Sequence, residues 1–366
     1  MTKDQMAPVA NPVPSFWNAE PRPLDDFRST KDLPSEIDIL IIGSGIAGVG
    51  TAYHLLQDSS FKASIAILEA RKPVSGATGR NGGHVKPDGF LNVPRTAKIH
   101  GADAAAELAK FEAAHVYAVK DLVEREGLDF SSTQDSNGSW TVTTPDGLIK
   151  AQKIIYATNG YTSHLLPEYT RCIVPIRGIA CHISSPKGTD TPHLVNTYGI
   201  RFDARNNDYL IPRPDGSIIV GGARQRFWHN KERWYGTIRD DELIEEAVSY
   251  FDDYMQRHFR GWENSGAKVE SIWTGIMGYS GDFMPHVGEV PDKPGQFIIA
   301  GFTGHGMPQI LLSSKGMAAM VRDGVSFENS GLPRIFKTTK ARISSKRNLM
   351  EESLEPLWKT GRESKL

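Results

Sequence analysis

The chain has 366 residues, of which 39% are hydrophobic and 23% are charged, and its formal net charge at pH 7 is −1. The length allows two domains, or one large domain with an insertion, and the apolar content is sufficient for a sizeable core. A net charge close to zero argues against nucleic acid or an anionic membrane as a partner, and no apolar stretch is long enough to cross a bilayer.

Three features of the sequence bear on the cell compartment. Residues 1–34 lack the apolar core of a signal peptide and are rich in proline, so we interpret them as an irregular arm on the surface. The two cysteines, Cys172 and Cys181, are too few for a disulfide framework and are typical of a reducing compartment. The sequence ends in Ser364-Lys365-Leu366, a tripeptide that the peroxisomal import receptor reads. We therefore expect a peroxisomal protein, or a cytoplasmic one if this signal is not used.

The first regular elements are predicted around a glycine-rich turn. Ile37–Ile42 is a mostly apolar run, typical of a strand buried on both faces, and residues 49–57 have the periodicity of a helix. Between them lies the pattern G-x-G-x-x-G, formed by Gly43, Gly45 and Gly48. These glycines permit a tight turn, a close approach of the backbone to a pyrophosphate, and close packing of helix and strand.

A second strand completes a β-α-β unit. It is predicted at Ile65–Leu68 and ends at Glu69, where a carboxylate can accept hydrogen bonds from both hydroxyls of a ribose. The same acid disfavours a 2′-phosphate and therefore NADP. With the strand, the helix and the acid in place, the turn predicts dinucleotide binding; the alternative is a glycine-rich turn without a ligand.

A second glycine-rich loop and several further elements follow along the chain. The loop Gly76–His84 contains too much glycine for a helix or strand and suits backbone wrapped around a cofactor. We predict a long amphipathic helix over 102–126, a hairpin of 140–143 with 148–151, and a buried strand at 153–156. Later elements are a hairpin of 209–212 with 217–222, a helix over 240–258, a strand at 297–300, a turn at Gly301–Met307, and a helix over 309–321.

Together these motifs resemble the superfamily of D-amino-acid oxidase and sarcosine oxidase, in particular its microbial and fungal branch. The resemblance rests on Gly43–Gly48 with Glu69, Gly76–His84, Ala157–Gly160, and Trp273–Gly278 with Gly301–Met307. It implies an α/β protein with two domains, a Rossmann-like FAD-binding domain and a mixed-sheet substrate domain that is truncated. We expect an arm at 1–34, a discontinuous FAD-binding domain at 35–170 and 271–330, a shortened substrate domain at 171–270, and a tail at 331–366.

The resemblance also implies which residues bind the cofactor, which is FAD held without a covalent bond. These residues are Gly43, Ser44, Gly45, Ile46, Ala47, Gly48, Glu69, Ala70, Arg71, Gly76, Ala77, Thr78, Arg80, Asn81, Gly82, Gly83, His84, Ala157, Thr158, Asn159, Gly278, Gly301, Thr303, Gly304, His305, Gly306 and Met307. In this family the last turn and the helix after it place a positive helix end beside the reduced flavin.

The sequence departs from the family pattern in two respects. Family members carry a much longer segment where this chain runs directly from Phe130 towards Trp140, so we infer an internal deletion in the substrate domain. The cysteine that bonds to flavin in the sarcosine oxidase branch is replaced by Gly275, and the lysine that activates oxygen is replaced by Ile219. Lys86 is a possible substitute for that lysine; the alternative is an ordinary surface lysine.

The implied reaction is oxidation of the C–N bond of an amine or amino acid, with hydride transfer to flavin and reduction of O2 to hydrogen peroxide. Candidate catalytic residues are Arg213 and Tyr209, for the substrate carboxylate, and His84 and Lys86, near the flavin. The histidines show no spacing typical of metal ligands, so no metal is expected. Three alternatives remain: a flavin-binding protein that has lost activity, a dehydrogenase that uses another electron acceptor, and an NAD-dependent dehydrogenase.

Overall fold

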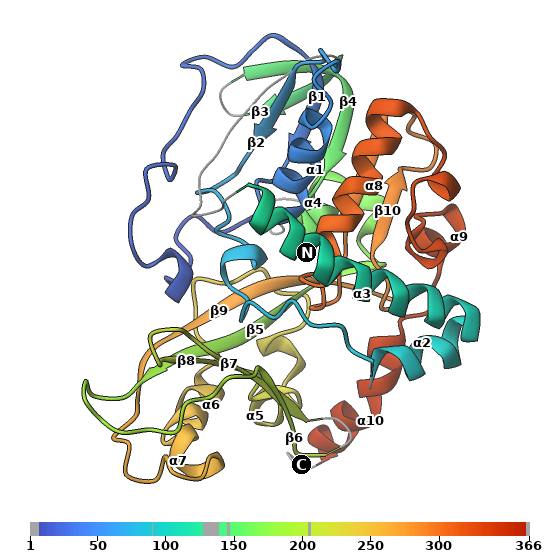
Figure 1. Ribbon diagram of the computed structural model, residues 1–366. Helices are drawn as coiled ribbons and strands as arrows, with labels where there is room; N and C mark the ends of the chain where they lie inside the picture. Colours follow the sequence, from blue (N-terminus) through green and yellow to red (C-terminus); the bar gives the residue numbers. More distant parts are fainter. Residues whose placement is uncertain (1–6, 90, 127–138, 145–146, 204–205, 364–366) are drawn as a thin grey trace.

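The computed structural model describes residues 7–89, 91–126, 139–144, 147–203 and 206–363 (Figure 1). The predicted deletion after Phe130 and the tripeptide at 364–366 lie outside these residues. Two β-sheets organise the chain, one in the upper and one in the lower half of Figure 1. Within the described part of the chain, no helix has the length and apolar character needed to cross a membrane.

The first sheet is built around the predicted β-α-β unit. β1 runs parallel to both of its neighbours, β2 and β4, and β11 continues the parallel part beyond β4. Two further strands, β10 and β3, join antiparallel. The bounds are β1 (Glu36–Ile42), β2 (Ile65–Leu68), β3 (Ser139–Thr144), β4 (Gly147–Tyr156), β10 (His286–Glu289) and β11 (Gln296–Ala300).

Both faces of β1 are covered, which explains its continuous apolar sequence. Ile39 and Ile41 belong to a core shared with α1 (Ile46–Leu56) and α8 (Ile310–Asp323), whereas Leu40 belongs to a second core on the other side. The two helices pack closely together. α3 (Ala102–Arg125) contacts α8, and α2 (Asn92–His100) and α4 (Thr162–Leu165) are shorter. The first sheet is therefore a buried layer with helices against it.

The second sheet is antiparallel and has the order β6-β7-β8-β5-β9. Its strands are β5 (Ile173–Ser184), β6 (Tyr198–Arg201), β7 (Asn207–Pro212), β8 (Ile218–Gly221) and β9 (Lys268–Ser280). Short helices, α5 (Arg224–Phe227), α6 (Glu245–Val248) and α7 (Tyr254–His258), lie below it in Figure 1. The strands β5 and β9 extend far enough to reach the first sheet, so the two halves share a common boundary.

Most predicted elements are confirmed, including the long helix, both hairpins and the last strand and helix. The predicted helix over 240–258 is wrong. Two short helices, α6 and α7, occupy this stretch instead, with a 3-10 turn between them. Asp253 takes a left-handed conformation with φ 50°, which no helix can continue through.

Both ends of the described chain pack against the body of the protein. Val13, Phe16 and Trp17 of the N-terminal arm contact a small core that includes buried Trp273. After residue 331, the chain forms α9 (Lys340–Ser344) and α10 (Leu349–Glu363). Met350 and Leu354 of α10 are buried in the core beneath the second sheet.

The buried His115 couples α3 to α8 and predicts a dependence of stability on pH. Its ring is fully buried, and its Nδ1 accepts a hydrogen bond from the Leu312 N–H at 3.4 Å. Burial lowers the pKa of His115 to about 4, against 6.5 in an exposed histidine. The unfolded chain therefore binds the proton more tightly, so stability present above pH 6.5 is lost as the pH falls towards 4.

Between pH 7 and pH 5 we expect this linkage to lower the free energy of unfolding by about 2 kcal/mol. A His115→Gln variant should lose correspondingly less over the same interval, as measured by urea unfolding at each pH. The exposed His193 offers a matched control, because His193→Gln should leave the pH dependence unchanged. An unchanged pH dependence in His115→Gln would contradict the assignment.

Candidate functional site

A cavity of about 1230 Å³ lies where the glycine-rich turns of the first sheet meet the second sheet. Its lining combines residues from the Gly43–Gly48 turn, the Gly76–His84 loop, the Gly301–Met307 turn and strands β5, β7 and β9. This volume exceeds the usual range of about 300–1000 Å³ for a single small-molecule pocket. The cavity therefore has room for a dinucleotide together with a smaller molecule.

The Gly43–Gly48 turn is so compact that two of its glycines have no room for a side chain. Gly43 has φ 106°, and a Cβ atom there would lie 2.7 Å from the Ala157 carbonyl oxygen. At Gly48 a Cβ atom would lie 2.0 Å from the carbonyl oxygen of Gly43. The turn thus brings the N-terminus of α1 directly to the end of β1, where its free N–H groups can receive a phosphate.

Glu69 is fixed beside this turn at the end of β2. One of its carboxylate oxygens accepts hydrogen bonds from the N–H and hydroxyl of Ser44, at 2.9 and 2.7 Å. The other oxygen accepts a bond from the Arg71 N–H at 3.1 Å. The carboxylate is therefore oriented in the cavity wall, where it can receive the hydroxyls of a ribose.

The side chains of Arg71 and Arg80 both pair with one buried carboxylate. Asp240 is fully buried and lies 3.0 Å from Nη1 of Arg71 and 3.5 Å from Nε of Arg80. Arg80 also donates hydrogen bonds to the carbonyls of Ser75 and Thr274. These two arginines line the cavity, but their charge is balanced by Asp240, which joins the glycine loop to the second half of the protein.

The N-terminal arm holds the Gly76–His84 loop in place. The Ser15 hydroxyl donates to the Gly79 carbonyl at 2.5 Å, and the Trp17 indole N–H donates to the Asn81 carbonyl at 2.6 Å. Asn81 in turn donates through Nδ2 to the carbonyls of Ala77 and Thr78. The arm therefore fixes the backbone of the loop that faces the cavity.

Replacing Trp17 by Phe should weaken this loop without removing the aromatic ring. Loss of one hydrogen bond is expected to lower the free energy of unfolding by about 1 kcal/mol. If the whole effect acts on the loop, affinity for FAD falls about fivefold, measurable by fluorescence titration. Trp262→Phe is the control, because this indole is buried but its N–H has no partner among the described residues. Equal effects of the two substitutions would contradict a role for the indole N–H.

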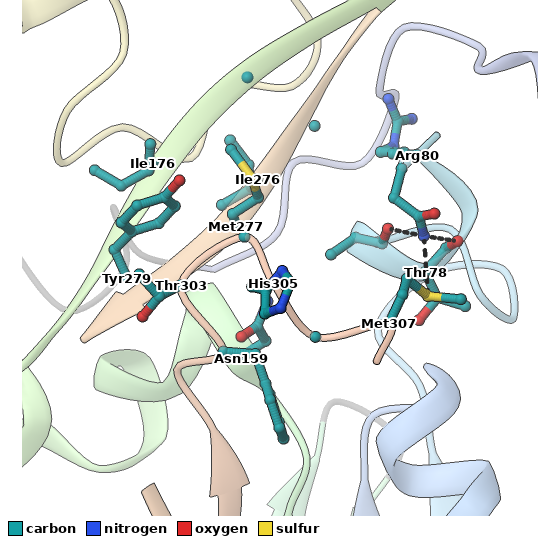
Figure 2. A pocket seen from close by; sticks show the side chains of 18 of the residues that line it. Thr78, Arg80, Asn159, Ile176, Ile276, Met277, Tyr279, Thr303, His305 and Met307 are labelled. Carbon is teal, nitrogen blue, oxygen red and sulfur yellow. Dashed lines mark hydrogen bonds between the residues drawn. The ribbon is translucent and has the colours of Figure 1, made fainter. Parts of the chain in front are cut away.

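The Gly301–Met307 turn has an unusual backbone. Gly301, Thr303 and Gly304 all have positive φ, and for the β-branched Thr303 a φ of 54° is uncommon. The Thr303 N–H donates to the Gly278 carbonyl at 2.7 Å, and the Gly301 N–H donates to Oδ1 of Asn159 at 3.2 Å. Figure 2 shows Asn159, Thr303 and His305 grouped at this turn. Such a strained turn before α8 is typical of a functional site.

His305 and a buried glutamate lie together behind this turn. Nε2 of His305 is 3.1 Å from Oε1 of Glu112, a residue of α3 that is almost fully buried. The same carboxylate oxygen accepts a hydrogen bond from Gln309 at 2.7 Å, just before α8 begins. Glu112 thus connects the turn to α3, and it belongs to no sequence motif that would have identified it.

Three of the four candidate catalytic residues line the cavity. The Tyr209 ring lies between Gly82 and Gly221, where a Cβ atom at either glycine would come within 2.4 Å of it. The His84 ring is 5.8 Å from that of Tyr209, and burial, with the charges of Lys86 and His305, lowers the pKa of His84 to about 4. Lys86 is exposed and lies near Gly199 at the cavity rim.

Arg213 is placed differently from the expectation. Its guanidinium lies over the rings of Phe16 and Trp17, with distances of 4.6 and 5.1 Å to the ring centres, and it is 3.7 Å from Asp215. It is not among the residues that line the cavity. Cation–π contact with the N-terminal arm therefore explains its position, and it offers no group to a substrate there.

Most of the predicted cofactor residues meet at this cavity. The described lining includes Gly43, Gly45, Ile46, Ala47, Glu69, Ala70, Arg71, Gly76, Ala77, Thr78, Arg80, Asn81, Gly82, His84, Ala157, Thr158, Asn159, Thr303, Gly304, His305, Gly306 and Met307. Five others lie behind this surface and support it through their backbone or packing: Ser44, Gly48, Gly83, Gly278 and Gly301.

The cavity also contains side chains that the sequence did not single out. Arg95 of α2 and Arg224 of α5 line it, together with Tyr279 at the end of β9. In Figure 2 the Tyr279 ring stands next to Ile176 and Met277, above Thr303 and His305. Of these three residues, only Tyr279 could have been suspected from the sequence, because it directly follows Gly278, a predicted cofactor residue. The two arginines come from segments without any motif.

A fold of two sheets with a dinucleotide site at their boundary is typical of an oxidoreductase that uses a nucleotide cofactor. The chain belongs to the family described as FAD dependent oxidoreductase, whose model matches residues 38–136 and 121–320. In sequence it is 23% identical over 227 residues to glycine oxidase of Geobacillus kaustophilus, an alignment that covers 62% of this chain and 53% of that protein. The aligned part of the chain thus spans about half the length, or less, of the first relatives that it matches.

Solved structures confirm the fold. The crystal structure of glycine oxidase from Geobacillus kaustophilus superposes with a TM-score of 0.62 at 15% identity, over 84% of this chain and 99% of that chain. L-proline dehydrogenase from P. horikoshii gives a TM-score of 0.53 at 19% identity, over 80% of this chain and 95% of that chain. The expected α/β architecture is therefore confirmed, and the match to the family model confirms the expected flavoenzyme family.

The residues present fit FAD. At Gly43 and Gly48 the turn is too tight for a Cβ atom, so the N-terminus of α1 reaches the cavity wall, where it can receive a pyrophosphate, and Glu69 lies beside it. Arg71 follows this acid closely in the cavity wall, but it is held by Asp240 and is not free to bind a 2′-phosphate. Both cysteines are buried and neither lines the cavity, so no thioether to the flavin can form.

Proposed function

We propose that this protein oxidises the C–N bond of an amine or amino acid and passes the electrons to O2, forming hydrogen peroxide. The observation that carries the proposal is the shared cavity, which joins the FAD-binding turns to tyrosine and arginine side chains of the second half. The likeness to glycine oxidase and to an L-amino acid deaminase supports the same class of substrate. The shortened substrate domain is part of the proposal, supported by the overlap of the two matched stretches at 121–136.

The residues of the cavity suit an uncharged amine nitrogen. His84 is neutral above about pH 5, because burial and the neighbouring positive charges lower its pKa to about 4. Its Nε2 is buried and has no partner among the described residues, so it is free for a polar group of the substrate. Burial raises the pKa of Tyr209, which therefore stays a neutral hydroxyl.

Bound FAD supplies the hydride acceptor for such an oxidation. The chain itself must orient the substrate, exclude water and favour the free amine over the ammonium form. The arginines near the flavin turn favour the free amine, since they repel a protonated nitrogen and attract a carboxylate.

Anaerobic mixing of the FAD-loaded protein with a panel of amines tests the proposal. We expect at least one amine to bleach the oxidised flavin, and peroxide to form when air is admitted. Bleaching without peroxide would favour a dehydrogenase with another acceptor. A flavoprotein that no amine bleaches would favour an inactive homologue, and purified protein without flavin would overturn the proposal. Sequencing the transcript across codons 125–140 tests the deletion.

We further propose that Ser364-Lys365-Leu366 directs the protein to peroxisomes, a compartment suited to an enzyme that makes peroxide. The signal needs a free carboxylate, so a fluorescent protein fused at the N-terminus leaves it intact. Peroxisomal fluorescence that becomes cytoplasmic when Leu366 is deleted is the expected result. Fluorescence that is cytoplasmic in both cases would contradict the proposal.

A further inference from the structure

Two half-buried arginines of the cavity differ from the more deeply buried arginines of this protein in their partners. Arg71 and Arg80 share Asp240, Arg177 lies 3.5 Å from Glu242, and Arg342 lies 2.7 Å from Asp282. Arg95 and Arg224 form no ion pair with any carboxylate in the described parts of the chain. Both line the cavity. Both side chains are half-buried. Because a charge partly withdrawn from water is costly without a counterion, two such guanidinium groups at one cavity point to an anionic occupant.

Each of these guanidinium groups is held by an aromatic platform. The Arg95 guanidinium carbon lies 4.3 Å from the centre of the Phe283 ring, and that of Arg224 lies 4.9 Å from the centre of the Trp228 ring. Contact through the flat face leaves the N–H groups at the edge of the guanidinium available for a carboxylate. Arg95 uses one of them on Asn92, and its Nε is buried without a partner among the described residues.

Both arginines line one cavity, and each lies within range of the other's charge. Burial lowers the pKa of Arg95. The neighbouring Tyr279 and Asp88 oppose this shift, and the positive charge of Arg224 adds to it. The Asp88 carboxylate accepts a hydrogen bond from the Leu91 N–H at 2.9 Å. Arg224 also acts on the Tyr209 hydroxyl. The pair is therefore close enough for both charges to act on one small molecule.

This part of the cavity adjoins the flavin turn. A Cβ atom on Gly304 would lie 2.8 Å from the Tyr279 hydroxyl, so Tyr279 packs directly on the Gly301–Met307 turn. Arg95 lines the same cavity and lies close enough to the Tyr279 hydroxyl to interact with it electrostatically. A molecule held by the arginines would consequently lie next to the place where the substrate of the proposed reaction must bind.

We propose that Arg95 and Arg224 bind the two carboxylates of a dicarboxylic amine, such as an acidic amino acid or an N-carboxyalkyl amino acid. This inference rests on the proposed function, which it narrows to one class of substrate. A monocarboxylic amine pairs with one guanidinium group and leaves the other in the cavity without a counterion. The protein thus selects dicarboxylic over monocarboxylic amines, because a monocarboxylic amine leaves the charge of one guanidinium group unpaired.

Calorimetric titration of the FAD-loaded protein with carboxylates that cannot be oxidised tests this inference. We expect malonate, succinate or glutarate to bind at least about tenfold more tightly than propionate or butyrate. Arg95→Ala and Arg224→Ala should each reduce this ratio to near one, and the corresponding Lys variants should retain part of it. Arg226→Ala is the matched control on the same helix, since Arg226 is exposed and does not line the cavity.

If the unaltered protein binds dicarboxylates no more tightly than monocarboxylates, the inference is overturned. This outcome does not depend on the folding of any variant. A ratio that persists in both alanine variants would overturn it as well. The outcome is separable from that of the proposed function. Preferential bleaching of the flavin by neutral amino acids would refute the dicarboxylate inference alone. Absence of bleaching by any amine would refute the oxidation, whereas the carboxylate titration would still decide the role of the two arginines.

Discussion

Replacing Asp240 by alanine is expected to lower the free energy of unfolding by about 3–5 kcal/mol. The carboxylate is fully buried and faces Arg71 and Arg80, whose side chains are 6% and 3% exposed. Removing it leaves two buried guanidinium groups without their shared counterion. Because both arginines belong to the segment that contains the glycine loop, we also expect weaker retention of FAD. Urea unfolding followed by tryptophan fluorescence measures the first effect, and gel filtration with flavin absorbance measures the second.

The neighbouring Asp241 provides the control for this experiment. It pairs with Arg239 at 2.8 Å, but the arginine side chain is half exposed. A surface ion pair of this kind contributes at most about 1 kcal/mol. Asp241→Ala should therefore change stability little, and Asp240→Asn should lie between Asp240→Ala and the unaltered protein. Comparable losses at positions 240 and 241 would show that the buried carboxylate is not essential to the site.

Gly48→Ala is expected to destabilise the protein by about 3 kcal/mol and to weaken FAD binding at least about tenfold. The added Cβ atom would lie 2.0 Å from the Gly43 carbonyl oxygen and 3.1 Å from Ile41 Cγ2. The first contact is with backbone, so the turn itself must move, and the helix N-terminus that receives the phosphates moves with it. Thermal unfolding with and without FAD, together with a fluorescence titration, measures both effects.

Gly76→Ala is the matched control, because it also lies in a glycine-rich stretch at the cavity. No atom lies within 4 Å of a Cβ atom built at Gly76, and its φ of −81° is open to any residue. We expect a change in stability within about 0.5 kcal/mol. A loss of FAD affinity in Gly76→Ala as large as that in Gly48→Ala would indicate a general sensitivity of glycine positions rather than a steric requirement of this turn.

The parts of the fold that the sequence predicted well are those set by local patterns. The β-α-β unit follows from an apolar run, a glycine-rich turn and a helical period, all within residues 36–68. The hairpin of β7 and β8 follows from a Pro-Asp-Gly turn between two apolar strands. The helical periodicity alone was misleading around Asp253, where several features that weaken a helix accumulate. One residue in the left-handed conformation interrupts the helix there.

The candidate site was predictable only where backbone motifs form it. Gly43, Glu69 and Thr303 belong to turns that follow strands, so their place in the cavity could be inferred. Arg213 was misjudged because the aromatic rings that attract it belong to the distant N-terminal arm. Arg95 and Arg224 were missed for a related reason: an unpaired arginine is recognised by the absence of a nearby acid, and the sequence does not reveal which acids are near.

The contacts that fix the glycine loop also have a consequence for synthesis of the protein. The residues of the loop are synthesised early. The side chain of Arg71, however, bonds to Asp240, and Arg80 bonds to Trp273 and Thr274, which lie more than 190 residues further along the chain. Contacts of such long sequence separation form slowly, and only after the later residues have left the ribosome. The wall of the cofactor site is therefore completed late, and a nascent chain that stops before β9 lacks Trp273 and Thr274, the partners of Arg80.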